Sequence, residues 1–279
     1  MKRQRSLAAR VPVLALLAAL AALAMPAVAA AAYPVSFAAA QAIDGTSTLR
    51  SIDCPTTTFC VAGDAQGYVL ASSSPTVASS WHATYLGAGS VTGISCPNAT
   101  DCVAVDAAGN AWTSSNPAAG SWTKVPTAAT HGFYGVSCPS TSICVAVSED
   151  DGVFVSTNGG AGWSGVSGTA SDAPDAVSCP STSLCVAVGY SQKAITITNL
   201  GAGGGASVVG DPTADSGSGL FQAVACPAAG LCVGVDSFGY AAVTTNPAGA
   251  VWDPAVATGT SNALDAIACP LTTSCVAVD

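Results

Sequence analysis

The chain has 279 residues, of which half are hydrophobic, 8% are charged and twelve are cysteine. Its formal net charge is −9 at pH 7, and only three of its seven basic residues follow residue 30, whereas all sixteen acidic residues do. Nucleic acid and anionic membranes would repel such a surface, so the composition excludes both as partners of the mature chain.

The first 29 residues have the three parts of a secretory signal peptide. Four basic residues lie within the first ten positions, an apolar run spans 11–24, and small residues at 27–29 offer a cleavage site. The apolar run is short for a membrane-spanning helix. We therefore predict that residues 1–29 are a cleaved signal peptide and that 30–279 are secreted, to an extracellular or cell-wall location.

The twelve cysteines form six copies of the motif Cys-Pro-x-x-x-x-Cys, and the first cysteines recur every 41 to 47 residues. A fixed period of this size indicates a repeat architecture. The predicted repeats start near residues 51, 93, 135, 176, 223 and 266, and the last is incomplete. In an oxidising compartment we expect each motif to close as a disulfide: Cys54 with Cys60, Cys96 with Cys102, Cys138 with Cys144, Cys179 with Cys185, Cys226 with Cys232, and Cys269 with Cys275.

Each repeat contains short β-branched runs bounded by turn residues, which predict four strands. Four strands in about 42 residues are typical of one propeller blade. We therefore predict an all-β fold, a β-propeller of four-stranded antiparallel blades with about six blades. Part of a larger propeller of seven or eight blades is the alternative. Tyr33–Phe37 is expected to supply an outer strand that helps to close the ring, and Ser207–Val209 a fourth strand in the irregular fourth repeat.

Two kinds of turn recur in the repeats. The Cys-Pro motif is expected to be a tight hairpin between the first and second strands, with a disulfide across it. An Asp-x-x-Gly turn is expected between the second and third strands, at Asp64, Asp106 and Asp236. Aspartate there can accept local N–H groups, and glycine can take a positive φ angle.

The connection between the third and fourth strands carries a third motif, best preserved as Ser156-Thr-Asn158-Gly-Gly160-Ala-Gly-Trp163. It resembles the Asp-box (BNR repeat) of sialidase-like and photosystem-assembly-factor-like propellers, with Asn158 at the aspartate position. Looser copies contain Asn116 with Trp122 and Asn246 with Trp252. The chain thus resembles secreted bacterial β-propellers with cysteine-stapled repeats. The resemblance implies a structural hairpin turn with a tryptophan packed beneath it, and implies no activity.

The inventory of reactive side chains argues against an enzyme. A sialidase needs several arginines and a Tyr/Glu pair, but after residue 30 only Arg50 and Glu149 are available. His82 and His131 are outside any nucleophile motif. The acidic run at 149–151 could attract a calcium ion, but a crowded hairpin tip explains it as well. We predict no catalytic residue, metal or cofactor.

Aromatic residues leave two interpretations open. The five tryptophans could form a carbohydrate-stacking surface, but four of them recur at a packing position near the start of the fourth strand, and Trp112 is out of phase. Tyr190, Phe238 and Tyr240 break the pattern near turns and could line a rim.

The leading hypothesis is an exported, non-catalytic propeller that binds a glycan, a cell-wall polymer or a protein. The alternative is a secreted polysaccharide hydrolase or lyase, with aspartates gathered at the central channel. The two differ in where the acids lie: an enzyme needs non-repeated acids that converge at one channel mouth, whereas a binding module leaves them scattered at hairpin tips.

Overall fold

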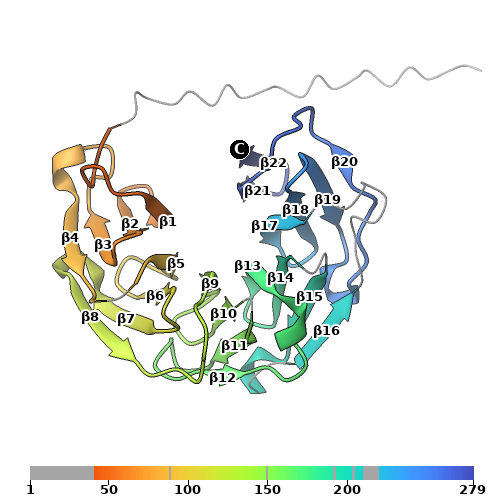
Figure 1. Ribbon diagram of the computed structural model, residues 1–279, viewed down its shortest axis with the longest axis horizontal. Coiled ribbons are helices and arrows are strands. Elements are labelled where there is room, and N and C mark those ends of the chain that lie inside the picture. Colours follow the sequence, from red (N-terminus) through yellow and green to blue (C-terminus); the bar gives the residue numbers. More distant parts are fainter. Residues whose placement is uncertain (1–40, 88, 149, 191–192, 203–204, 210–219) are drawn as a thin grey trace, which may run out of the picture. The chain divides into compact units, whose positions relative to one another are not determined.

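The structure, a computed structural model, describes residues 41–279 except 88, 149, 191–192, 203–204 and 210–219. The described residues form six antiparallel sheets in chain order, five of four strands and one of two strands. Figure 1 shows these sheets side by side around a central opening, as the blades of a β-propeller. This confirms the predicted fold class. The predicted signal peptide and the predicted strand at Tyr33–Phe37 lie outside the described residues.

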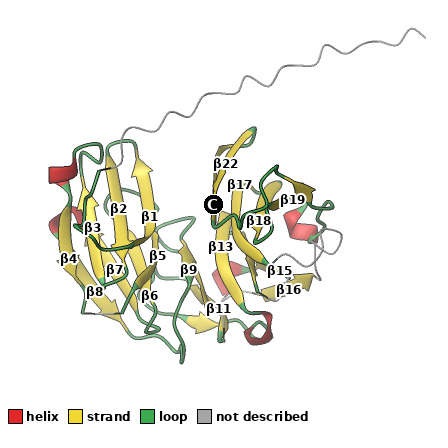
Figure 2. Ribbon diagram, turned by 45° about the horizontal axis from the view of Figure 1, so that its top comes forward, coloured by secondary structure: helices red, strands yellow, loops and turns green. Residues whose placement is uncertain are grey.

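Within a blade, the strands follow one another outward in chain order. The first strands line the opening and the fourth strands lie at the periphery (Figures 1 and 2). The first strands are β1 (Leu49–Thr56), β5 (Val91–Ser95), β9 (Gly135–Ser137), β13 (Pro174–Ser181), β17 (Phe221–Ala228) and β21 (Ala266–Leu271). The second strands are β2 (Phe59–Asp64), β6 (Cys102–Asp106), β10 (Cys144–Ser148), β14 (Leu184–Gly189), β18 (Leu231–Asp236) and β22 (Ser274–Val278).

Blades 1 to 5 also contain a third and a fourth strand. The third strands are β3 (Tyr68–Ser72), β7 (Ala111–Asn116), β11 (Gly152–Ser156), β15 (Ala194–Thr198) and β19 (Tyr240–Thr244). The fourth strands are β4 (His82–Tyr85), β8 (Ser121–Val125), β12 (Ser164–Gly165), β16 (Gly205–Val209) and β20 (Val256–Ala257). Strand β16 pairs with β15 along its whole length, which confirms the strand predicted at Ser207–Val209.

Short connections complete the blades. They include the single-turn 3₁₀ helices η1 (Ala78–Ser80), η2 (Pro117–Ala119), η3 (Ala170–Asp172), η4 (Leu200–Ala202) and η5 (Pro247–Gly249). No helix in the described part of the chain is long and apolar enough to cross a membrane.

The hydrophobic core is divided among the blade interfaces. Side chains alternate along each strand, so the two faces of a blade pack against different neighbours. In β6, for example, Ala104 packs with blade 1, whereas Val103 and Val105 pack with blade 3. Two further clusters join blade 3 to blade 4 and blade 4 to blade 5. Blades 1 to 4 therefore each depend on the next blade for the burial of an apolar face.

A repeated hydrogen bond also joins consecutive blades beside the central opening. The residue before the first cysteine of a blade accepts the backbone N–H of the first cysteine of the next blade. In blade 3, the Ser137 hydroxyl accepts from Cys179 N–H at 3.1 Å. The equivalent acceptors are Asp53 for Cys96 N–H, Ser95 for Cys138 N–H and Ser178 for Cys226 N–H, at 2.6, 2.9 and 3.0 Å. We call this contact the blade clamp. Blade 5 has Ala225 at this position and so cannot form it.

All six predicted disulfides are present, each between cysteines six positions apart, with Cα atoms 4.0–4.1 Å from one another. Each joins the end of a first strand to the start of a second strand in the same blade. The disulfides are therefore local to single blades, whereas the blade clamps and the hydrophobic clusters connect the blades to one another.

Candidate functional site

The strand order gives the propeller two chemically different faces. The connections from second to third strands lie at one face, which we call the hairpin face. The disulfides and the connections from third to fourth strands lie at the opposite face, which we call the disulfide face.

Three of the hairpins on the hairpin face are closed by a buried aspartate, as predicted. The Asp106 carboxylate accepts the N–H groups of Ala108 and Asn110, both at 2.9 Å. Asp64 and Asp236 accept the equivalent pairs of N–H groups in blades 1 and 5. All three aspartates are at most 1% exposed, so a bound polysaccharide could not reach them. The glycines that end these turns have φ angles of 92°, 78° and 80°.

A second carboxyl lies beside the hairpin of blade 1. Burial raises the pKa of Asp44, and the hydrogen bond and negative charge of Asp64 raise it further. In blade 2, the corresponding aspartate oxygen has a neutral partner, because the Asn110 side-chain amide donates to Asp106 at 2.9 Å. The buried aspartate therefore has a second carboxyl beside it in blade 1 (Asp44) and a neutral amide beside it in blade 2 (Asn110).

The acidic run of blade 3 lies in the hairpin between β10 and β11, and it is hydrogen-bonded to the loop that precedes β9. Glu149 lies outside the described residues. Asp151 accepts the backbone N–H groups of Thr130 and His131 and the Thr130 hydroxyl, each at 2.7 Å. Burial alone would raise the pKa of Asp151, but these hydrogen bonds outweigh it and lower the pKa to about 2. No group of three or more His, Cys, Asp or Glu side chains within the described ranges is placed to hold a metal ion.

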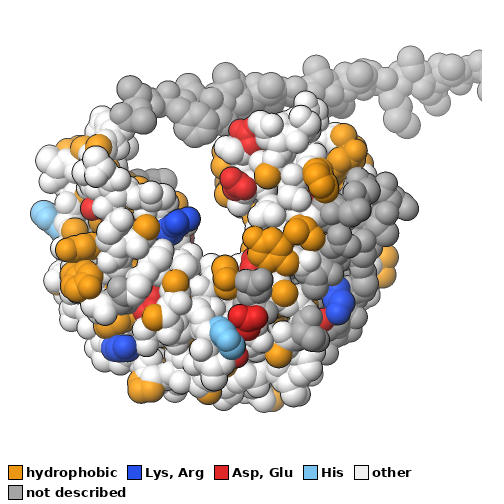
Figure 3. Space-filling model, viewed as in Figure 1, with side chains coloured by type: hydrophobic (Ala, Val, Ile, Leu, Met, Phe, Trp, Pro, Cys, Tyr) orange, Lys and Arg blue, Asp and Glu red, His pale blue; other side chains and the backbone are white. Residues whose placement is uncertain are grey.

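Acidic side chains are otherwise spread around the ring. Figure 3 shows them as separate groups on the face in view, without a cluster at the central opening. Asp172 is buried against Lys193 at 2.7 Å. Of the two arrangements that the sequence left open, the scattered one matches the described residues.

The Asp-box-like hairpin of blade 3 lies on the disulfide face. The Ser156 hydroxyl accepts Gly160 N–H and donates to the Asn158 side-chain oxygen, both at 2.9 Å. Trp163 packs into the core shared by blades 2 and 3, with its ring centre 6.3 Å from that of Phe133. Gly160 has a φ angle of 85°, and a Cβ atom there would lie 2.8 Å from Val103 of blade 2. The hairpin therefore fixes the contact between two blades.

The looser copies of this motif lie at equivalent connections. Asn246 accepts Gly249 N–H at 3.1 Å and so caps η5, whereas the Asn116 backbone N–H donates to Ser114 and its side chain caps nothing. Trp122 and Trp252 pack into the cores between blades 1 and 2 and between blades 4 and 5. The two tryptophans thus pack between blades, whereas only one of the two asparagines makes a side-chain hydrogen bond within its turn.

The remaining tryptophans do not form a stacking surface. Trp112, the residue out of phase, is only 8% exposed, and its indole N–H donates to Asp106 at 3.1 Å. Trp81 is half-buried, and its indole N–H donates to the Pro75 carbonyl at 3.2 Å. Trp112 is therefore a packing residue, and Trp81 is held against its own connection by the indole N–H.

Five aromatic side chains in the described part of the chain are more than a third exposed, and all five lie on the hairpin face. Two of them, Tyr190 after β14 and Phe238 between β18 and β19, are residues that the sequence predicted at a rim. Tyr240, predicted with them, is half-buried at the start of β19. The other exposed aromatics, which the sequence did not single out, are Tyr134 before β9 and Tyr68 and Tyr85 on blade 1.

The few basic side chains are on the same face. Arg50 is the second residue of β1 and is exposed, and Lys193 immediately precedes β15. Lys124 lies near the end of β8, with its ammonium group 5.6 Å from the centre of the Trp112 ring. The hairpin face thus combines exposed aromatic rings with all three basic residues that follow residue 30.

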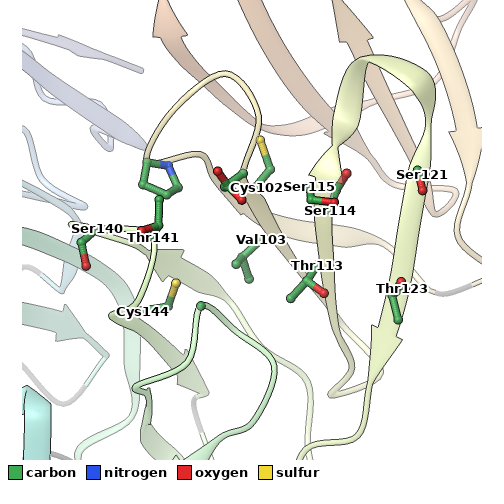
Figure 4. Close-up of a pocket in the computed structure, with 13 residues that line it drawn as sticks. Cys102, Val103, Thr113, Ser114, Ser115, Ser121, Thr123, Ser140, Thr141 and Cys144 are labelled. Atoms are coloured by element: carbon green, nitrogen blue, oxygen red, sulfur yellow. The ribbon is translucent and has the colours of Figure 1, made fainter.

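The disulfide face has a small polar pocket between blades 2 and 3 (Figure 4). Its volume is about 190 Å³. Its single acidic group, Asp101, accepts hydrogen bonds from Asn98 and Thr100 at 3.0 and 2.9 Å. Seven hydroxyl side chains line it: Thr113, Ser114, Ser115, Ser121, Thr123, Ser140 and Thr141. Such a lining can exchange hydrogen bonds with a small polar group.

No family model matches this chain, and no curated protein matches its sequence. Solved propeller structures are similar to it. They include YCF48 bound to D1 peptide (10% identity, TM-score 0.58, 76% of this chain and 68% of that chain). The RRP9 WD40 repeats (11%, 0.63, 75% and 66%) and U3-55K (11%, 0.64, 80% and 70%) are also similar. At these identities the likeness establishes the fold, and the chain is a β-propeller.

Proposed function

We propose that this protein is an exported, non-catalytic binding and scaffold module that holds a protein or peptide on its hairpin face. The observation that carries the proposal is the location of the exposed aromatics, all on one face of the ring. Exposed tyrosine and phenylalanine supply large contact areas and are enriched at protein interfaces. The basic residues on this face add hydrogen-bond donors for carbonyl and carboxylate groups of a partner.

Two further observations support the proposal. YCF48, a propeller of similar fold, is bound to a peptide in its structure. The six disulfides suit an oxidising compartment outside the cytoplasm, in line with the signal peptide predicted at 1–29. The buried hairpin aspartates make the rival hydrolase or lyase less favourable, because such an enzyme needs accessible carboxylates.

A glycan or cell-wall polymer is the second candidate, and the hydroxyl-lined pocket on the disulfide face favours it. Hydroxyl groups can both donate to and accept from sugar hydroxyls. The two candidates therefore place the ligand on opposite faces, and mutations can separate them.

The test is peptide selection on the secreted, oxidised chain with a displayed random-peptide library. Selected peptides are then measured against a hairpin-face variant that carries Tyr134→Ser, Tyr190→Ser and Phe238→Ser. The matched control carries Val77→Ser, Val251→Ser and Leu271→Ser, which are exposed positions toward the disulfide face: the first two lie in connections and Leu271 ends β21. We expect affinity to fall at least about tenfold in the first variant and to be unchanged in the control.

The proposal is overturned if no peptide is enriched or if both variants bind the selected peptides as well as the wild type does. The glycan candidate is tested in parallel on immobilised glycans and purified cell walls. It requires retention of the wild type and weaker retention after Thr113→Val and Thr141→Val in the pocket.

A further inference from the structure

One position of the repeat differs in chemistry from blade to blade. It lies four residues before the first cysteine, at the hairpin-face end of each first strand, and we call it the bulge position. The residue before it is apolar, and the residue after it is Ser, Gly or Ala, in every repeat. The six residues at the bulge position are Arg50, Thr92, Tyr134, Asp175, Gln222 and Asp265. The flanking residues therefore have a structural role that all blades share, whereas the residues at the bulge position do not share one.

The backbone sets this residue apart from the rest of the strand. In blades 1, 2, 4 and 5 the pairing of the first and second strands skips it, so it is the extra residue of a β-bulge. In blades 3 and 6 it immediately precedes the first strand. None of the six residues is buried, although the apolar residue before them is buried in blades 2 to 6. A bulge can re-aim a side chain, and these bulges lie at the central opening, which the first strands line.

In blades 3 and 4, an acidic residue at the bulge position lies between two exposed tyrosines. The Asp175 carbonyl oxygen is 3.3 Å from the place that a Cβ atom on Gly135 would take. The Asp175 backbone nitrogen is 2.6 Å from the place that a Cβ atom on Gly189 would take. Tyr134 precedes the first of these glycines, and Tyr190 follows the second. The backbone of Asp175 therefore lies between those of Tyr134 and Tyr190 at the rim of the opening.

The three side chains are of the types that bind an organic cation. Tyr134 and Tyr190 are 45% and 46% exposed, and Asp175 is half-buried. A phenol ring attracts an ammonium or guanidinium group to its face, and a carboxylate forms charge-assisted hydrogen bonds with the same groups. A carboxylate has about four acceptor sites, so it can bind a ligand while it keeps contacts within the protein. Figure 3 shows hydrophobic side chains, a class that includes tyrosine in this view, beside the central opening over blades 3 to 5.

The charge of this part of the chain also favours a basic ligand. From residue 135 onward the chain has eleven acidic residues and one basic residue, Lys193. The Lys193 ammonium group is bound to Asp172 at 2.7 Å. On the hairpin of blade 3, the Asp150 side chain is 64% exposed. A negative surface of this kind attracts a basic partner and repels an acidic one.

We propose that Tyr134, Asp175 and Tyr190 form a site for a lysine or arginine side chain of the peptide or protein partner. The basic group would lie against a tyrosine ring and donate to the Asp175 carboxylate. This inference rests on the function proposed above only for the carrier of that side chain, because the same three residues would bind the same cation on a small molecule. It adds the chemistry of the partner: a basic residue at the point of contact with blades 3 and 4.

The experiment is an NMR titration of the secreted, oxidised chain, labelled with ¹³C in its tyrosine rings, with Nα-acetyl-lysine methylamide at low salt. The matched probe is Nα-acetyl-norleucine methylamide, which has an alkyl side chain without the ammonium group. Tyr134→Phe and Tyr190→Phe each lose one ring signal and so provide the assignments. We expect the lysine probe to shift the Tyr134 and Tyr190 signals in a saturable way and the norleucine probe to leave them unchanged. Added salt should weaken the binding of the lysine probe.

Two pairs of variants test the named side chains. Asp175→Asn keeps the shape of the side chain and removes its charge, and Asp265→Asn removes the same charge at the bulge position of blade 6, away from both tyrosines. We expect Asp175→Asn to bind the lysine probe about tenfold more weakly and Asp265→Asn to bind it within about twofold of the wild type. Tyr134→Leu removes the ring face and should weaken binding about fivefold, whereas Tyr134→Phe keeps the face and should retain it. Circular dichroism and thermal melting confirm that the variants fold.

The outcomes separate this site from the proposed function. The site is wrong if neither tyrosine signal responds to the lysine probe or if the norleucine probe gives the same shifts. It is also wrong if Asp175→Asn and Asp265→Asn weaken binding equally, which would be an effect of net charge. Peptides selected on the wild type should contain Lys or Arg more often than the library does, and peptides that bind this face without a basic residue would overturn the site and leave the proposed function intact. Probe binding without any enriched peptide would support the site and overturn the proposed function.

Discussion

The blade clamp gives the most direct prediction about how the ring is held together. Ser137→Ala removes the hydroxyl that accepts Cys179 N–H at 3.1 Å, at the interface of blades 3 and 4. A half-buried N–H that loses its partner costs about 1 kcal/mol. The local opening of this junction should become easier by that amount, which corresponds to about a fivefold change in an equilibrium constant.

The assay is native-state hydrogen exchange of the Cys179 amide, because a chain of several blades need not unfold in a single cooperative step. We expect exchange at Cys179 to accelerate about fivefold in Ser137→Ala, with no change at the Cys96 amide, which Asp53 holds at a distant junction.

The chain offers a reciprocal variant. Ala225 occupies the clamp position of blade 5, so Ala225→Ser should supply an acceptor for Cys269 N–H and slow its exchange by a similar factor. Unchanged exchange at Cys179 in Ser137→Ala, or equal acceleration at all junctions, would refute the clamp as a local inter-blade contact.

Three further predictions concern single sites. Asp44→Asn should raise the melting temperature at pH 7. The Asp44 carboxyl has a pKa that burial and the Asp64 carboxylate raise, whereas an amide at this position is neutral and can donate a hydrogen bond to Asp64. A raised pKa means that the wild type gains stability as pH falls, so the advantage of the variant should shrink toward about pH 4; an advantage that is constant with pH contradicts this. Gly160→Ala should destabilise more than Gly168→Ala in chemical denaturation, since both have positive φ angles but only at Gly160 would a Cβ atom clash with Val103; equal losses would mean that no clash contributes. Replacement of the Cys138–Cys144 pair by alanine should cost about 2 kcal/mol for a loop of this length, measured by denaturation against the oxidised wild type, and no loss would rule out a stabilising staple.

Local features of this fold can be predicted from the sequence because neighbours in the chain make them. The cysteine pairs are six residues apart, and the aspartate of each Asp-x-x-Gly turn binds N–H groups two and four residues further on. Strand β16 follows from the Ser-Val-Val sequence at 207–209, which contains two adjacent β-branched residues. Such contacts need no knowledge of how the blades are arranged.

Contacts between blades are harder to predict. The clamp joins Ser137 to Cys179, 42 residues away, although the recurrent Ser-Cys-Pro and Asp-Cys-Pro sequences were a usable signal. The exposure of Tyr134 depends on its location at the end of a blade, since Phe133, its neighbour, is fully buried. The rim aromatics Tyr190 and Phe238 were predicted because they break the repeat, whereas Tyr134 does not stand out in that way.

The central claim is that each repeat is a separate blade closed by its own disulfide. Proteolysis of the secreted chain under non-reducing conditions, followed by mass spectrometry, tests it most directly. We predict six linked pairs, each within one Cys-Pro-x-x-x-x-Cys motif, and no free thiol. Disulfides between different repeats, or thiols that remain free in the folded chain, would contradict the claim.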